Sequence, residues 1–364
     1  MNIENLIYAY LAICVSMIIF NWICIFVFKH SENKVKSRST EFESRIAEQI
    51  DQMNRGLQPD EKHKEYLCKK LNKVGNLTAL DETIERLFKE NPEAVKNYLS
   101  AIYPVFTYLA KKYEKKDEIQ AAYFSYVIRR FGILKDRPFG IIVDTLFEML
   151  HEHSLYCREN ALQAIYSMGN CACVIRGLKI IDSGGQFHHS KLLTDGLLTF
   201  TGSHQELASE LWKAFDDFSP QMKVTILNYF RFSDADCCEE IMRIMIDKKH
   251  EDDIRFSCIR YFGKRYYEPA IPILLDFAQS ADEERWEYAA IASSVLGRYP
   301  SEKSIEILKN NLNNCNWYIR FNASESLEKF GLSYMDLTDV FDGGDRYARE
   351  ILQYRLDQRL SLIH

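Results

Sequence analysis

Six basic side chains recur along this chain at intervals of 30 to 35 residues. They are Arg158, Lys191, Lys223, Arg255, Arg285 and Arg320. Guanidinium and ammonium groups repeated in this way can bind phosphate or an acidic partner. They can equally pair with a carboxylate or carbonyl of an adjacent repeat and so orient successive units, since structural ion pairs also recur. The sequence therefore allows two interpretations of these bases, a binding stripe and an inter-repeat ladder.

Aromatic side chains are the second group with binding potential, and they are densest in the C-terminal half. Phe230 and Phe262 fall at apolar helical spacing, which predicts core positions. Other aromatics fall at turns or helix starts, and aromatics combined with Arg form hot spots in protein recognition. We therefore predict a partner-binding surface from Arg255, Arg285, Trp317, Tyr318, Arg320, Tyr266 and Tyr267.

Motifs for catalysis or metal binding are not found in the sequence. His151-Glu152-His153 and Cys171-Ala172-Cys173 lack a recurring zinc spacing. Gly184-Gly185 does not follow a strand, which argues against a phosphate loop. Nucleophile-elbow, zinc-protease and kinase motifs are missing as well. We expect no enzyme activity, no cofactor and no metal.

The elements that position these side chains form a repeat. Each base, with Trp286 in place of Arg285, is followed by small or apolar residues three and seven positions later. In four repeats a Gly follows at the eleventh position. This spacing is one face of a helix with its end marked. A recurrence of this length predicts an all-α fold, a solenoid of helix pairs, with Phe262 and Leu327 in its core.

The pattern divides the chain into six parts. They are a short extracytoplasmic N-terminus (1–5), a transmembrane anchor (6–28), a linker and amphipathic stalk helix (29–59), an irregular helical cap region (60–119), HEAT-like repeats (120–331) and C-terminal capping helices (332–364). In the cap region we expect a helix from Asp60 to end at Gly75 and a helix over Glu93–Lys112 to kink at Pro104. Helix-capping residues are Ser219, Asp252, Asp282 and Asn316.

The segment from Leu6 to Phe28 carries no charge over 23 residues. A helix of that length crosses a hydrocarbon core of roughly 30 Å. A cleaved signal peptide would have a basic start and small residues at its end, whereas here Glu4 precedes the segment and aromatics close it. The features favour an uncleaved, single-pass anchor in the cell membrane.

The flanks of this segment predict its orientation. Lys29, Lys34, Lys36 and Arg38 follow it, and no Lys or Arg precedes it. The positive-inside rule then places the rest of the chain in the cytoplasm. The ten cysteines agree, because most fall at apolar helix positions as reduced thiols do. The net charge of −6 argues against a general nucleic-acid binder.

Two segments carry a family resemblance. DDIRFSCIRYFG (252–263) and NWYIRFNASESLEKFG (316–331) resemble the HEAT-like repeats of the PBS-lyase type, in which an Arg opens the second helix and a Leu-Gly or Phe-Gly pair ends it. The likeness extends over roughly residues 120 to 331. It implies that the Arg is a packing element. Proteins with such repeats include lyases, scaffolds, transport factors and DNA glycosylases, so the resemblance does not select a function.

The features together predict a membrane-tethered cytoplasmic scaffold or adaptor. Its second helices would line a groove that binds a membrane-associated protein, such as a membrane enzyme or an envelope assembly. The alternative is a lyase-like or ligand-sensing protein that acts on a small molecule or a phosphate-bearing ligand. A strongly positive groove favours ligand sensing, and a mixed aromatic groove favours scaffolding. The oligomeric state is not predicted.

Overall fold

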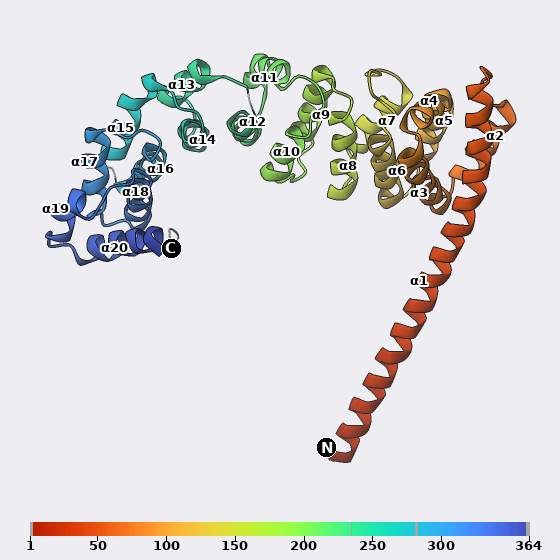
Figure 1. Cartoon of the computed structure of the whole chain (residues 1–364), viewed down its shortest axis with the longest axis horizontal. Helices are drawn as coiled ribbons and strands as arrows, with labels where there is room; N and C mark the ends of the chain where they lie inside the picture. The colour runs from red at the N-terminus through yellow and green to blue at the C-terminus, as the bar shows by residue number, and fades with distance from the viewer. Residues whose placement is uncertain (1–2, 234, 281–282, 362–364) are drawn as a thin grey trace. The chain divides into compact units, whose positions relative to one another are not determined.

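The computed structural model describes residues 3–233, 235–280 and 283–361, and all regular structure in these ranges is helical (Figure 1). The predicted helix start at Asp282 lies outside the described residues. The chain divides into two compact units, residues 1–180 and 181–364, and each is described by itself. All ten cysteines are free thiols.

The helices of the first unit are α1 (Ile3–Asn54), α2 (Glu61–Leu71), α3 (Val74–Glu90), α4 (Pro92–Ala101), α5 (Tyr103–Tyr113), α6 (Glu118–Arg130), α7 (Ile141–Met149), α8 (Leu155–Tyr166) and α9 (Cys171–Ser183), which ends just beyond the boundary. Helix α1 packs against α3 and α4, α3 against α6, and α6 against α8. The buried side chains of Phe42 and Ile46 fix the second half of α1 to this body.

Helix α1 is continuous, so the predicted linker at 29–40 is helical and joins the apolar segment directly to the stalk. Its apolar side chains are exposed, among them Trp22, Phe26 and Phe28. An 18-residue window of this helix reaches a mean hydropathy of 2.6 with none of it buried. Length and composition suit a membrane span, and a signal sequence near the N-terminus meets the same description.

Two helix boundaries in the first unit differ from the prediction. Gly75 lies in the first turn of α3, because α2 already ends at Leu71 and the side-chain amide of Asn76 donates to the Lys70 carbonyl at 2.7 Å across the turn. Pro104 does not kink one long helix but separates two. It lies in the first turn of α5, where its missing N–H has no helical partner to lose.

The helices of the second unit are α10 (Ser190–Leu197), α11 (His204–Lys213), α12 (Pro220–Phe232), α13 (Cys238–Ile246), α14 (Asp252–Phe262), α15 (Ile271–Gln279), α16 (Trp286–Leu296), α17 (Glu302–Asn311), α18 (Trp317–Lys329), α19 (Thr338–Phe341) and α20 (Arg346–Ser361). The even-numbered helices from α10 to α20 pack each on the next. Helices α13, α15 and α17 each pack on the helix that follows. The described residues thus confirm the all-helical prediction, and Phe262 and Leu327 are fully buried.

The capping predictions hold at two positions and fail at one. Ser219 accepts a hydrogen bond from the Met222 N–H at 3.3 Å, and Asn316 accepts one from the Tyr318 N–H at 2.9 Å. Asp252 does not cap α14; its carboxylate accepts from the hydroxyl of Tyr288 at 2.6 Å instead. The residue is therefore used to join α14 to α16.

Two predicted helix-end glycines serve different purposes. Gly331 follows α18 with φ 71°, a left-handed conformation that L side chains rarely adopt. Gly297 follows α16 with φ −57°, where any residue is allowed. A Cβ there would lie 2.7 Å from the Ser326 hydroxyl, so Gly297 permits the close approach of α16 to α18.

Candidate functional site

The repeated bases divide by environment. Arg158 and Arg255 are buried, Arg320 is partly buried, and Lys191 and Arg285 are exposed. The placement of Arg255 is a correction to the predicted surface, because only about 5% of this residue is exposed.

Three arginines of this series, Arg158, Arg255 and Arg320, brace the connection that precedes their own helix. Arg158 donates to the carbonyls of Glu152 and His153 at 2.9 and 2.8 Å. Arg255 Nε donates to the Met245 carbonyl at 3.1 Å, and Arg320 Nε donates to the Asn314 carbonyl. Each bond ties the end of a first helix to the start of its second helix.

Two of the arginines also reach the next repeat. Arg255 Nη1 donates to the Tyr288 hydroxyl of α16 at 2.6 Å, and Arg320 pairs with Asp345, just before α20, at 3.1 Å. The arrangement favours the ladder interpretation at these positions, with satisfied donors that stabilise the stacking of helices.

Exposed and partly buried aromatics gather at the N-terminal ends of α16 and α18. We call Trp286, Trp317, Tyr318 and Phe321 the aromatic patch. Trp286 stacks on Tyr318 at 5.4 Å between ring centroids, Tyr318 meets Trp317 edge to face at 5.3 Å, and Trp317 stacks on Phe321 at 4.9 Å. Trp317 is 58% exposed and Tyr318 is 56% exposed. Beneath them Trp286 packs on Ala289, Ala290 and Ile319.

The two remaining predicted residues lie elsewhere. Tyr266 stacks on the buried ring of Tyr299 at 5.0 Å, and Tyr267 stacks on Phe262 at 5.9 Å. Both follow α14, on the side where α16 ends, whereas the aromatic patch lies where α16 begins. With 11 residues, α16 separates the two groups by about 16 Å. The predicted surface is therefore two surfaces.

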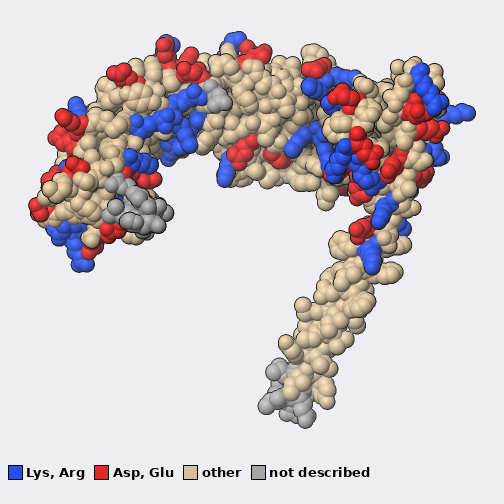
Figure 2. Space-filling view, viewed as in Figure 1, with Lys and Arg blue, Asp and Glu red and all other residues tan. Residues whose placement is uncertain are grey.

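Tyr266 lines a cavity that the sequence analysis missed. We call it the basic pocket; its volume is about 550 Å³. Its lining residues are Arg231, Phe232, Ser233, Asp236, Cys238, Lys264, Arg265, Tyr266 and Arg298. Figure 2 shows Lys and Arg side chains gathered over α14 and its surroundings. The missed signal is a base at or just after the end of each second helix, at Arg231, Lys264 and Arg298, 33 and 34 residues apart.

The cations of the basic pocket have few partners. Arg265 donates to the Ser233 carbonyl at 2.7 Å. Arg231 lies over the Phe232 ring at 5.0 Å, and its buried Nε has no hydrogen-bond acceptor. Burial and the positive charge of Arg260 lower the pKa of Arg231. Among the residues that the structure describes, no carboxylate lies within 4 Å of a pocket cation.

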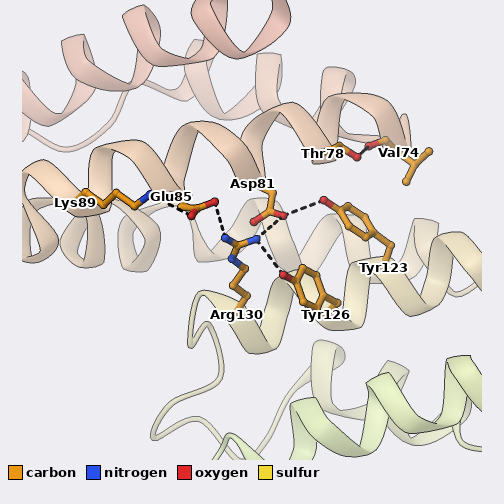
Figure 3. Close-up of polar contacts among 8 residues, drawn as sticks. All are labelled: Val74, Thr78, Asp81, Glu85, Lys89, Tyr123, Tyr126 and Arg130. Carbon is orange, nitrogen blue, oxygen red and sulfur yellow. Dashed lines mark hydrogen bonds and ion pairs between the residues drawn. The ribbon is translucent and has the colours of Figure 1, made fainter. Parts of the chain in front are cut away.

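The first unit contains a charged cluster of the opposite kind (Figure 3). Arg130, in the last turn of α6, pairs with Asp81 at 3.0 Å and with Glu85 at 2.8 Å, both on α3. Tyr123 donates to the same oxygen of Asp81 at 3.0 Å. Burial raises the pKa of Asp81, although Tyr123 and Arg130 oppose the shift. The cluster joins α3 to α6.

The described residues at these surfaces include a thiol but no group of metal ligands. Groups of three or more metal-ligating side chains are not found among the described residues. The thiol of Cys238 lines the basic pocket, but burial raises its pKa to about 11, so it is protonated at neutral pH.

Comparisons with known proteins give no family. No family model matches the sequence, and no curated protein is similar to it. Among solved structures, human deoxyhypusine hydroxylase in complex with glycerol aligns over 82% of this chain and 96% of its own, at 14% identity and a TM-score of 0.28. A similarity this low supports no conclusion about fold or function.

Proposed function

We propose that this protein is a membrane-tethered scaffold of the HEAT-like α-solenoid type, and that its aromatic patch captures a membrane-associated protein partner. Successive even-numbered helices that pack on one another support the solenoid part of the proposal. The arginines that brace Met245 and Asn314 support it as well, because they occupy the packing position expected for HEAT-like repeats.

The anchor part of the proposal rests on α1. Its apolar half is followed by the bases Lys29, Lys34 and Lys36, and the positive-inside rule applied to them supports a cytoplasmic location for the helical body. Because α1 is unbroken up to its contacts with α3, the body is held close to the membrane surface. Tethering raises the local concentration of the aromatic patch near membrane partners and strengthens binding without new contacts. A reporter fused to the C-terminus should be active as a cytoplasmic reporter.

The observation that carries the proposal is the exposure of stacked aromatics. Trp317 and Tyr318 each leave more than half of their surface in water although they are rigid and apolar. Arg285, exposed at the edge of the patch, adds the cation that accompanies aromatics in protein hot spots. A protein partner that covered these rings would remove their apolar surface from water, and this burial would contribute to the binding free energy.

The test compares two aromatic deletions in the detergent-extracted full chain. Trp317→Ala should reduce capture of the partner at least tenfold. A hot-spot residue contributes about 2 kcal/mol of binding free energy, which corresponds to about a thirtyfold change in affinity. Tyr156→Ala is the control, since Tyr156 is equally exposed on α8 of the first unit. If both variants retain the same partners in crosslinked pull-downs, the aromatic patch is not the binding surface.

The alternative function, binding or sensing of a phosphate-bearing small ligand, is favoured by a separate observation. The basic pocket is strongly positive in a chain of net negative charge. It lies at the other end of α16 from the aromatic patch, so the two functions are compatible.

A further inference from the structure

We propose that the basic pocket is a binding site for a small molecule whose phosphate groups together carry two or more negative charges. The inference rests on the pocket alone and is independent of any protein partner of the aromatic patch.

The first argument is charge. Arg231, Lys264, Arg265 and Arg298 line one cavity, and Asp236 is the only carboxylate among the described lining residues. Like charges in a concave, partly desolvated site repel one another and raise the local potential. Elsewhere in the second unit cations pair with carboxylates, as Lys309 does with Asp339 at 2.8 Å. An anion in the pocket supplies the neutralisation that the described protein groups do not.

The second argument is preorganisation. The backbone N–H of Cys237 donates to the buried hydroxyl of Tyr261 at 3.1 Å. The N–H of Tyr267 donates to the hydroxyl of Tyr299 at 3.2 Å, and that hydroxyl donates to the Phe262 carbonyl at 3.0 Å. These bonds fix the backbone at Cys237 and at Tyr267, which flank the pocket on its two sides. A site whose backbone is already ordered loses less conformational entropy when a ligand binds.

The third argument concerns the ligand class. Guanidinium groups present planar pairs of donors that match phosphate oxygens, and several cations spread around one cavity match a ligand with several charges. The volume of about 550 Å³ suits a small organic phosphate or diphosphate. The exposed rings of Phe232 and Tyr266 offer apolar faces to a sugar or base attached to it. The pocket therefore fits a phosphorylated metabolite or a phosphorylated lipid headgroup.

Inorganic pyrophosphate is the probe, titrated into the full chain in neutral detergent and followed by calorimetry at low salt. We expect binding that weakens as salt is added. Arg298→Gln should lower the affinity about tenfold, and Lys264→Gln combined with Arg298→Gln about a hundredfold. Both side chains are exposed, so the fold should be retained, and circular dichroism checks this. Lys303→Gln, an exposed Lys outside the pocket, is the charge-matched control and should bind as the parent does.

Three results would overturn the proposal. One is no heat and no stabilisation of the folded chain by 1 mM pyrophosphate at low salt. Another is pyrophosphate binding that the double variant leaves unchanged. Equal, pocket-dependent binding of a polyglutamate peptide would likewise refute the phosphate class.

A second arm separates the two sources of the phosphate. The full chain is placed in nanodiscs of phosphatidylcholine, with or without phosphatidylinositol 4-phosphate. If a lipid headgroup is the occupant, the doped nanodiscs weaken pyrophosphate binding in the parent but have no effect in the double variant. If a soluble metabolite is the occupant, the lipid composition makes no difference. Either result is consistent with the phosphate site.

Discussion

Arg130 and Arg231 lie in the same place on their helices, the last turn of α6 and of α12, but in opposite surroundings. Helix α3 presents Asp81 and Glu85 to Arg130 from one face, because residues four apart lie together on a helix. Arg231 faces other cations and an aromatic ring. The first arginine fastens two helices, and the second is left available for a ligand.

The comparison teaches that a base at a helix end has no fixed role. A positive charge there is favourable in any case, since it meets the negative end of the helix dipole. What differs is whether an adjacent helix supplies carboxylates. In the first unit it does, and polar bonds add to packing. In the second unit, buried tyrosine hydroxyls and Arg265 hold the backbone beside the pocket, and Arg231 does not pair with a carboxylate of a neighbouring helix among the described residues.

The largest expected effect is a difference in unfolding free energy between variants of two phenylalanines, Phe262 and Phe232, that end neighbouring helices beside the basic pocket. Phe262 ends α14 fully buried, whereas Phe232 ends α12 half exposed and lines the pocket. Phe262→Ala should cost about 3–5 kcal/mol of unfolding free energy through the cavity it leaves. Phe232→Ala should cost below about 0.5 kcal/mol, as surface changes do. Urea unfolding of both variants checks this, and similar losses would mean that the pocket rim is core.

The next effect concerns pH in the first unit. Burial, and secondarily the charge of Arg45, lower the pKa of His63 from 6.5 to about 4. Its Nε2 lies 2.7 Å from the hydroxyl of Tyr98. Because the unfolded chain binds a proton between these values and the folded chain does not, stability is complete above pH 6.5 and falls as the pH is lowered toward 4.

When the pH is lowered from 7 to 5, protonation of His63 in the unfolded chain should reduce the unfolding free energy by about 2 kcal/mol, at 1.36 kcal/mol per pH unit. His63→Gln removes the titrating group, so its unfolding free energy should change less over the same range. Urea titrations of parent and variant at the two pH values measure the difference. Equal slopes would show that His63 is already accessible to protons in the folded state.

The third effect tests the fastening role of Arg130. Arg130→Gln should cost about 1 kcal/mol, at the low end for a charged hydrogen bond because one third of the side chain is exposed to screening water. Arg129→Gln, a base exposed on the same turn, is the matched control and should have little effect. A loss no larger than that of the control would mean that the cluster in Figure 3 does not stabilise the unit.

The sequence predicted the helices well because their signals are local. Apolar spacing and capping residues such as Ser219 and Asn316 act within one or two turns. Pro104 and Gly75 were misassigned because each tolerates two helix positions, and neighbouring contacts decide between them.

The sites were harder to predict because their members are distant in the chain. The partners Asp81 and Arg130 are 49 residues apart, and the pocket cations come from three helix ends. The periodic bases drew attention to the helix starts, where Arg255 proves to be buried. Only the packing of α12, α14 and α16 reveals that a second set of bases, at the opposite ends of these helices, faces a common cavity.

The smallest expected effect has the opposite sign from the others. Arg298→Gln removes one of several like charges from the basic pocket and breaks no hydrogen bond or ion pair between that side chain and another described residue. In low salt and without ligand it should raise the unfolding free energy by a few tenths of a kcal/mol, because repulsion between the cations is relieved. In 0.5 M sodium chloride the Debye length falls to about 4 Å, and the gain should disappear. Urea unfolding at the two salt concentrations measures it, with Lys303→Gln as the control. A destabilised variant would show that Arg298 fastens the turn after α16 as Arg130 fastens α6, and the contrast between the two helix ends would then be lost.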